Sequence, residues 1–204
     1  MNDRLALLDY RRMVAEMYAR VRSGRLGEPA CCLQFRRERD ALFGNHPQSA
    51  LSPQQQTRFT GLSYYPYDPG FRFVVPVERV ADTPPAEVHL SEDGPVRLQR
   101  SGRVRFPVAG QEITLTLFWI LGYGGGLFLP FRDATNKDET YEGGRYLLDT
   151  IKGADLGQDG GRLILDFNYA YNPSCAYDPR WDCPLAPPEN WLSVPIRAGE
   201  RRFA

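Results

Sequence analysis

The apolar residues of this 204-residue chain change their spacing once, and that change limits the folds open to it. Over residues 3–22 they recur every three or four positions, as in Tyr10 and Val14, which predicts an amphipathic helix. From about residue 71 large apolar residues recur at every second position, as in Phe71 and Phe73, which predicts strands. The chain should therefore begin with helices and continue as β-structure.

Two further helices are expected before the strands begin. A break at Gly27 separates the first helix from a second one, which we expect over residues 30–43. Ser52 precedes Pro53 and is followed three positions later by Gln55, which is the arrangement of a capping box with proline in the first helical turn. A short third helix should follow Ser52.

The strand pattern continues to about residue 168, with short turns and no helix between the strands. The turns are rich in Gly, Asp and Asn, and Ser101-Gly102 has the composition of a hairpin turn. Six to eight strands of this kind predict a mainly β, α+β fold, in which an antiparallel β-barrel or folded sheet carries the N-terminal helices. The expected strands cover residues 71–77, 96–100, 104–108, 111–121, 127–131, 145–151 and 163–168.

No repeat or low-complexity linker divides the chain, so we expect a single domain of residues 1–204. Its parts would be a mostly helical arm (1–60), antiparallel β-structure (61–168) and a proline-rich closing loop with a C-terminal strand (169–204). The closing loop has no helical or strand period but many aromatic residues and prolines. Ordered loops of this length are usually functional or structural clasps, and we expect this one to cover one end of the β-structure.

Charge and hydropathy argue against two classes of partner. Lys+Arg and Asp+Glu are equal at 25 each, so the basic excess of a nucleic-acid-binding protein is absent. Charged residues interrupt the N-terminal segment, and no apolar run reaches the length of a signal peptide core or a membrane span. We therefore expect a cytoplasmic protein without a nucleic-acid or membrane partner, whose cysteines are mostly reduced.

Three polar clusters fall where predicted strands begin or end. Side chains alternate along a strand, so Asp166 and Asn168 should share one face, and Arg132 and Arg145 are their natural partners. In a ligand pocket, the arginines would hold an anionic or carbonyl group and Asp166 would orient it or act as a catalytic acid or base. In a structural clasp, the same residues would only hold the loops together. The ligand-binding candidates are Arg132, Asp133, Tyr141, Arg145, Asn168, Tyr171 and Asn172.

The cysteines allow several kinds of chemistry. Cys175 and Cys183 enclose seven residues, across which a disulfide is geometrically feasible but is opposed by a reducing compartment. A zinc site would also need Cys31 and Cys32, and adjacent cysteines are awkward ligands, so zinc is only an alternative to the absence of any cofactor. A nucleophilic Cys175, the second catalytic candidate, would need a base such as His46. The simplest state is reduced, largely buried thiols.

Three stretches of the chain carry a family resemblance: FLPFRDATNKDETYEGGRYL, LDFNYAYNPSCAY and CPLAPPENWL. They resemble the signature of a bacterial and archaeal family whose function is unknown. The helix around residues 35–43 and HPQSAL are also similar to that family, but Ala50 stands where the family shows proline, which makes the loop after His46 less rigid. The resemblance implies where a site lies and implies no reaction or cofactor. Its positions are Arg132, Asp133, Thr135, Thr140, Tyr141, Gly144, Arg145, Tyr146, Asp166, Asn168, Tyr171, Asn172, Pro173, Cys175, Tyr177, Cys183, Pro184 and Asn190.

The sequence supports two main hypotheses about function. In the first, a small-molecule site at one end of the β-structure serves a binding protein or a cofactor-independent enzyme that performs hydrolysis or proton transfer on an anionic or carbonyl-containing substrate. In the second, the polar clusters are a clasp in a non-catalytic interaction domain, whose partners include a second copy in a homodimer. A metal or redox role for the cysteines is a third, minor hypothesis. The substitution Asp166→Asn separates the first two.

Overall fold

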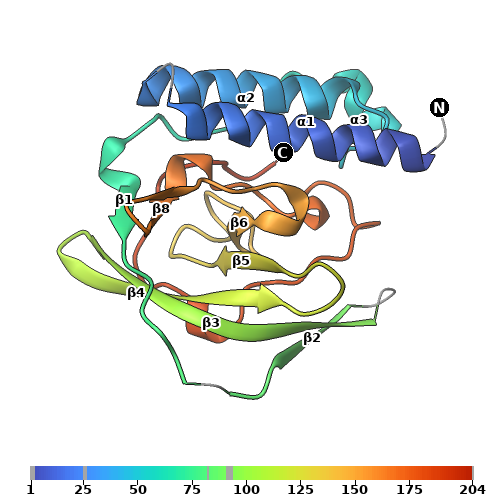
Figure 1. The fold of residues 1–204 in the computed structure, drawn as a ribbon. Helices are drawn as coiled ribbons and strands as arrows, with labels where there is room; N and C mark the ends of the chain where they lie inside the picture. Colours follow the sequence, from blue (N-terminus) through green and yellow to red (C-terminus); the bar gives the residue numbers. More distant parts are fainter. Residues whose placement is uncertain (1–2, 25–26, 82, 91–93, 204) are drawn as a thin grey trace.

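Three helices form one layer of the molecule, above the β-structure in the view of Figure 1. The computed structural model describes residues 3–24, 27–81, 83–90 and 94–203. The helices are α1 (Asp3–Ser23), α2 (Glu28–Asn45) and α3 (Pro53–Arg58). Ser52 Oγ accepts a hydrogen bond from the Gln55 N–H, and the Gln55 side chain accepts one from the Ser52 N–H, so the expected capping box is present. The three predicted helices are confirmed.

The strands form two antiparallel sheets. The larger sheet has the order β2-β3-β4-β5-β6 and the smaller has the order β1-β8-β7. Within the described residues these strands make a folded sheet and do not close into a barrel, so the predicted α+β fold is confirmed in its folded-sheet form. The strands are β1 (Arg72–Val75), β2 (Ala86–Leu90), β3 (Gly94–Val108), β4 (Gln111–Ile120), β5 (Gly126–Phe131), β6 (Arg145–Asp149), β7 (Gln158–Asp159) and β8 (Arg162–Asp166).

The hairpin expected at Ser101-Gly102 is wrong. Strand β3 runs straight through these residues, with only a shift of register between Arg100 and Gly102. The glycine serves a close approach instead, because a Cβ on Gly102 would lie 2.5 Å from Val77 Cγ1. The hairpin turn lies later, at Ala109-Gly110, where both residues have positive φ (50° and 77°), as a tight primed turn requires.

One apolar core joins the two sheets to the helical layer. Its fully buried members come from strands of both sheets, as with Leu115 and Leu165, and from the C-terminal segment, as with Ile196. Met17 of α1 and Phe35 of α2 contact the same cluster. The closing loop therefore packs between helices and sheets, where it contributes short 3-10 turns and isolated β-bridges.

Helix α1 lies very close to the turn that follows β6. Gly153 has φ 85°, and a Cβ there would be 3.3 Å from the backbone of Ala15. At this contact the backbone of helix α1 lies directly against the turn, with no side chain between them. Within the described ranges, no helix has the length and apolarity needed to cross a lipid bilayer.

Candidate functional site

Arg145 and Asp133 form a fully buried ion pair. The Arg145 Nη2–Asp133 Oδ2 distance is 2.8 Å, and both side chains are 0% exposed. The guanidinium also donates to the carbonyl oxygens of Ile196, Ala198 and Glu200, so one side chain fastens the C-terminal segment to β6. Asp133 Oδ1 accepts from the backbone N–H groups of residues 135 and 196. Among the described residues Arg145 Nε has no hydrogen-bond partner, but both terminal nitrogens of the guanidinium and both oxygens of Asp133 are bonded within the protein.

Arg132 points to a different environment from Arg145. Its guanidinium carbon lies 4.5 Å from the ring centroid of Trp191, a cation–π contact. Its backbone N–H donates to Asn190 O, and its carbonyl accepts from Leu192 N–H. The neighbouring residues Arg132 and Asp133 therefore make separate contacts: Arg132 packs on Trp191 near the surface, and Asp133 pairs with Arg145 in the core.

Asp166 and Asn168 bind each other and an upstream loop. Asp166 Oδ1 accepts from the Asn168 backbone N–H (3.0 Å) and from Asn168 Nδ2 (2.8 Å). Asn168 lies in a 3-10 turn after β8, and its side chain donates to and accepts from the backbone of Asp68. Asp166 Oδ2 is buried and has no hydrogen-bond partner within the described part of the chain, and burial raises the pKa of this carboxyl to about 6. The carboxyl lines a small cavity of about 140 Å³ that Glu28 and Arg72 also line.

Tyr171 and Asn172 line a different cavity, which we call the inner chamber. It has a volume of about 90 Å³ and lies between α1, α2, β6 and the closing loop. The Asn172 backbone N–H donates to Glu200 Oε2, and Asn172 Nδ2 donates to Arg201 O. The inner chamber is lined by Tyr10, Val14, Tyr18, Arg39, Phe43, Tyr146, Asp149, Lys152, Ala154, Tyr171, Asn172, Pro173, Ser174 and Tyr177.

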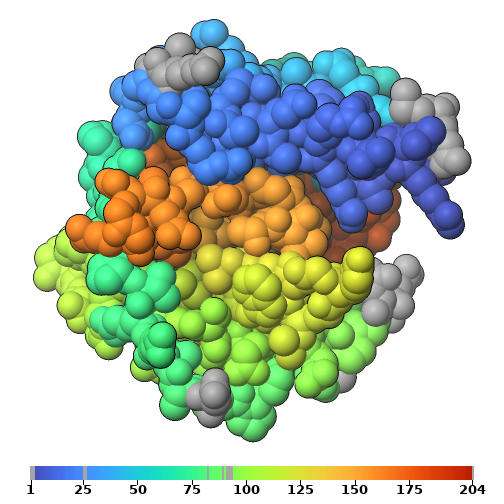
Figure 2. Space-filling view, in the orientation of Figure 1, coloured from blue at the N-terminus to red at the C-terminus, as the bar shows by residue number. Residues whose placement is uncertain are grey.

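The inner chamber adjoins a larger hollow, which we call the outer chamber. Its volume is about 440 Å³, and it shares Tyr10, Lys152 and Ser174 with the inner chamber. Figure 2 shows the elements that border it: α1 in dark blue, the segment around residue 150 in orange and the closing loop in red. Together the chambers form a cleft below α1. The other residues of the outer chamber are Leu7, Arg11, Gln48, Ala50, Trp181, Asp182 and Cys183.

Buried charges surround the inner chamber. Arg39 Nη2 lies 3.2 Å from Glu200 Oε2, and the Tyr177 hydroxyl donates to Glu200 Oε1. Lys152 Nζ lies 3.8 Å from Asp149 Oδ2 at the boundary of the two chambers. Burial raises the pKa of the Asp149 carboxyl, although Lys152 opposes this shift. Cations and carboxylates thus occur in pairs, and the chamber has no large excess of either charge.

Burial also sets the state of the phenols in this chamber. It raises the pKa of the Tyr10, Tyr18 and Tyr171 hydroxyls above their usual range. These groups therefore stay protonated at any ordinary pH and can donate hydrogen bonds. The inner chamber combines aromatic faces with phenol donors.

Cys175 and Cys183 lie in contact beside Tyr141. The Cys175 backbone N–H donates to Cys183 Sγ at 3.4 Å, and the Tyr141 hydroxyl donates to Cys175 Sγ at 3.6 Å. Both cysteines are half-buried free thiols. The hydrogen bond from Cys175 lowers the pKa of Cys183 to about 6, and the same interaction raises the pKa of Cys175.

The other cysteines and His46 have separate surroundings. The Cys32 thiol contacts Asn168 O at 3.8 Å and the Cys31 thiol contacts Arg20 O at 4.0 Å. Across the described parts of the chain, no three His, Cys, Asp or Glu side chains gather as metal ligands. His46 accepts from the Gln48 N–H and lies 3.5 Å from Asp9, and none of its described contacts is with Cys175.

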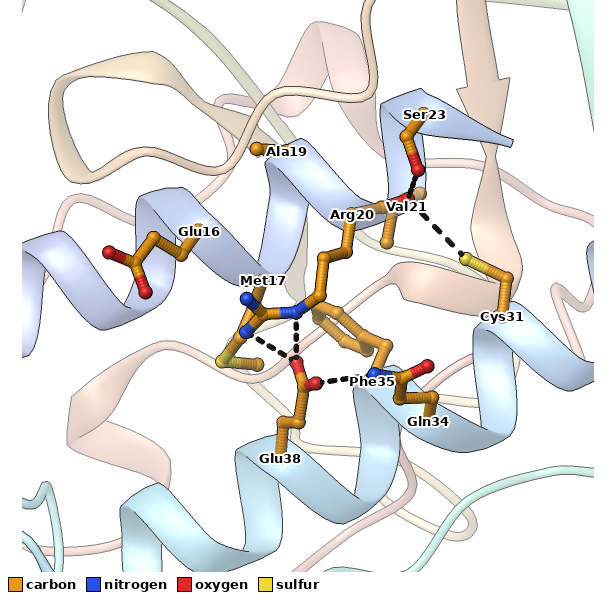
Figure 3. Close-up of a pocket in the computed structure, with 10 residues that line it drawn as sticks. All are labelled: Glu16, Met17, Ala19, Arg20, Val21, Ser23, Cys31, Gln34, Phe35 and Glu38. Carbon is orange, nitrogen blue, oxygen red and sulfur yellow. Dashed lines mark hydrogen bonds and ion pairs between the residues drawn. The ribbon is translucent and has the colours of Figure 1, made fainter. Parts of the chain in front are cut away.

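A further hollow of about 410 Å³ lies between α1 and α2. In Figure 3 the Arg20 guanidinium reaches across it to the Glu38 carboxylate, with an Nη2–Oε2 distance of 2.9 Å. Gln34 also donates to Glu38, and Ser23 donates to the Arg20 carbonyl. Arg20, Gln34, Glu38 and Ser23 bond to each other, which leaves Glu16 as the polar group of this hollow outside that network, so the hollow has less to offer a ligand than the cleft below α1.

Sequence reasoning missed several residues of the inner chamber. Arg39 and Glu200 were not candidates, because they lie 161 positions apart and their pairing depends on the tertiary fold. One signal was present in α2, where Arg36 and Arg39 occupy the same buried stripe as Phe35 and Leu42. An arginine on the apolar stripe of a helix needs a buried partner, so it marks a polar site within the fold.

Comparison with known proteins gives a family but no activity. A family profile described as a protein of unknown function, DUF1684, matches residues 57–201. The solution NMR structure of an uncharacterised protein of Haloarcula marismortui is 35% identical, with a TM-score of 0.57, and the match covers 83% of this chain and 91% of that chain. No curated protein is significantly similar to the sequence. The expected membership of a family of unknown function is thereby confirmed: this chain belongs to the DUF1684 family.

Proposed function

We propose that the protein binds a small molecule with a carbonyl or carboxylate group in the cleft below α1. The polar group would occupy the inner chamber, and the rest of the molecule would lie in the outer chamber. This assignment moves the proposed site from the Arg145–Asp133 pair to the neighbourhood of Tyr171 and Asn172, two of the residues that the sequence indicated.

Two unpartnered polar atoms carry this proposal. Arg39 Nε and Asn172 Oδ1 are both buried and have no hydrogen-bond partner among the residues that the structure describes, and both side chains line the inner chamber. A buried donor or acceptor without a partner costs about 1–3 kcal/mol, so such atoms usually bind water or a ligand. One is a donor and the other an acceptor. A carbonyl or carboxylate oxygen complements the donor, and a hydroxyl group beside it on the ligand would complement the acceptor.

The outer chamber suits the body of such a molecule. At about 440 Å³ it lies in the range of small-molecule sites. Trp181 and Leu7 provide apolar surface, and the two cations of the lining, Arg11 and Lys152, outnumber its one carboxylate, Asp182. This balance favours a carboxylate over an amine as a ligand.

Asp149 is the group that we assign to proton transfer with a bound carbonyl compound. Its carboxyl is buried beside Lys152, and burial raises its pKa above the ordinary value. Asp166 and Cys175 do not line the inner chamber. Their predicted catalytic roles would belong to separate sites.

For Arg145 and Asp133, a structural role is the second candidate function. Arg145 and Asp133 are fully buried and bonded to each other and to the C-terminal backbone. We infer that these two residues act as the clasp of the alternative hypothesis, which frames the cleft without touching its ligand.

The proposal is tested by binding of pyruvate, benzoate and neutral methyl benzoate, measured by saturation-transfer NMR. Benzoate should bind to the wild type, and Lys152→Met should weaken its binding by roughly two- to fivefold through loss of one exposed charge. The only other lysine, Lys137, is exposed and outside the cleft, so Lys137→Met is the matched control and should leave affinity unchanged. Methyl benzoate should be insensitive to both changes. No binding of any probe at millimolar concentration, or equal effects of the two lysine variants on benzoate, would contradict the proposal.

A further inference from the structure

Cys175 and Cys183 differ in their hydrogen bonding although they form one pair. The Tyr141 hydroxyl donates to Cys175 Sγ, and both the backbone N–H and the thiol of Cys175 interact with Cys183 Sγ. The two donors of Cys175 point toward Cys183, whereas the Tyr141 hydroxyl points toward Cys175. The donors of Cys175 stabilise a thiolate at Cys183, and the Tyr141 hydrogen bond is a smaller, opposing effect at Cys175.

Cys183 is the cysteine of the pair that lines the outer chamber. There, Lys152 contributes positive charge that favours a thiolate. Cys31 and Cys32 are buried, and burial raises the pKa of Cys32 to about 11. The chain thus contains one activated thiol with a second thiol next to it, and two inert thiols elsewhere.

Hydrogen bonds fix the loop between Cys175 and Cys183 at its start and near its end. Arg180 Nη2 donates to Leu51 O at 2.8 Å, and Trp181 Nε1 donates to Ala50 O at 2.9 Å. At the start of the loop, Ala176 N–H and Tyr177 N–H donate to the carbonyls of residues 173 and 174. These anchors hold the two sulfur atoms together without a covalent bond.

We propose that Cys183 and Cys175 form a thiol–disulfide exchange site whose substrate is a low-molecular-weight disulfide. The Cys183 thiolate attacks one sulfur of the disulfide RSSR, which breaks the S–S bond and releases RS⁻. Cys175 then attacks Cys183 Sγ in the mixed disulfide, so the second RS⁻ leaves and the Cys175 proton passes to a released thiolate. The protein dithiol is oxidised to an intramolecular disulfide and RSSR is reduced to two thiols. This activity does not depend on a ligand in the inner chamber.

The test places the full-length protein in buffers of reduced and oxidised glutathione, followed by acid quenching, alkylation and peptide mass spectrometry. In the wild type, a Cys175–Cys183 disulfide should form in oxidising buffer and disappear when reduced glutathione is added. Cys31 and Cys32 should be recovered as free thiols throughout and serve as internal controls. Recovery of Cys175 and Cys183 as free thiols at every glutathione ratio would overturn the proposal.

Two serine variants assign the order of the steps. Cys175→Ser should accumulate a mixed disulfide with glutathione at Cys183, because the second thiol is missing. Cys183→Ser should be modified at Cys175 more slowly than Cys175→Ser is at Cys183, because burial still raises the pKa of the Cys175 thiol after the hydrogen bond to Cys183 is removed. Equal rates for the two variants would contradict the roles given to the two cysteines. The wild-type result stands by itself if a variant folds poorly, and none of these readouts depends on binding of benzoate or pyruvate.

Discussion

The guanidinium of Arg39 and the carboxylate of Glu200 form a buried ion pair, although 161 positions separate them in the sequence. Glu200 also accepts hydrogen bonds from the Tyr177 hydroxyl and the Asn172 backbone N–H. One carboxylate thus joins helix α2, the closing loop and the C-terminal segment behind the inner chamber. The shape of the proposed site depends on this contact.

Glu200→Gln should destabilise the protein by about 3–5 kcal/mol, because it leaves the Arg39 charge buried without a counter-charge. Glu38→Gln is the matched control. Glu38 lies on α2, as Arg39 does, and pairs with Arg20 in a partly exposed position. That change should cost at most about 1 kcal/mol. Urea unfolding followed by circular dichroism measures both free energies of unfolding. Similar losses in the two variants would show that Glu200 has no special role.

Asp166→Asn should stabilise the protein at neutral pH and change little at pH 4. The folded-state pKa of about 6 exceeds the ordinary 3.8, so the folded protein keeps a proton that the unfolded chain releases. Wild-type stability therefore falls as pH rises from about 4 to 6, and two pKa units correspond to about 3 kcal/mol. The variant should lack this fall, which urea unfolding at several pH values measures.

The control for this experiment is Asp159→Asn, which alters an exposed carboxylate. Its difference in stability from the wild type should not grow between pH 4 and pH 7. If Asp166→Asn instead lowers stability by the same amount at every pH, the Asp166 carboxylate makes a stabilising interaction in the folded protein. Asp166 would then be a structural residue, as the clasp hypothesis states.

Gly144→Ala should disturb the Arg145 clasp. Gly144 has φ 92°, and a Cβ there would lie 2.4 Å from the Phe131 carbonyl oxygen. Gly160 also has positive φ but has open space around it, so Gly160→Ala measures the backbone strain alone. The Gly144 variant should lose about 1–3 kcal/mol more than the Gly160 variant, as overpacked sites do. Equal melting temperatures would contradict the close approach of the two strands.

Much of the fold could be predicted because its signals are local. The spacing of apolar residues located the first helix, the break at Gly27 separated it from the second, and the Ser52 capping box marked the start of the third. The turn was wrongly placed at Ser101-Gly102 because a glycine can indicate either a turn or a close contact between two parts of the chain. Only the approach of the chain at Val77, distant in sequence, decides between them.

The candidate site was less predictable, because it depends on which strands are neighbours. We expected the polar ends of three strands to meet, but β8 pairs with β1 in the smaller sheet while β5 pairs with β6 in the larger one. Asp166 therefore bonds to Asn168, which in turn bonds to the loop at Asp68, and not to Arg145. Tyr171 and Asn172 do lie at a cleft, but its other walls come from helices that no strand pattern could place.

The pH dependence of alkylation should distinguish the two cysteines of the closing loop. Because the thiolate is the reactive form, the rate at Cys183 should reach half its maximum near pH 6, whereas Cys175 should stay slow until well above pH 9. Peptide-resolved iodoacetamide kinetics measures both profiles. Lys152→Met should shift the Cys183 profile to higher pH. Two profiles with the same midpoint near pH 9 would contradict the hydrogen-bond geometry.

The cleft below α1 is tested most directly by the indole N–H resonances of the three tryptophans during titration with benzoate. Trp181 lines the outer chamber, whereas Trp119 lies beside Gly125 and Trp191 lies under Arg132. A ligand in the cleft should shift the Trp181 resonance in a saturable manner and leave the other two unchanged. A saturable shift of Trp119 or Trp191 with Trp181 unmoved, or no shift of any indole, would contradict a small-molecule site in this cleft.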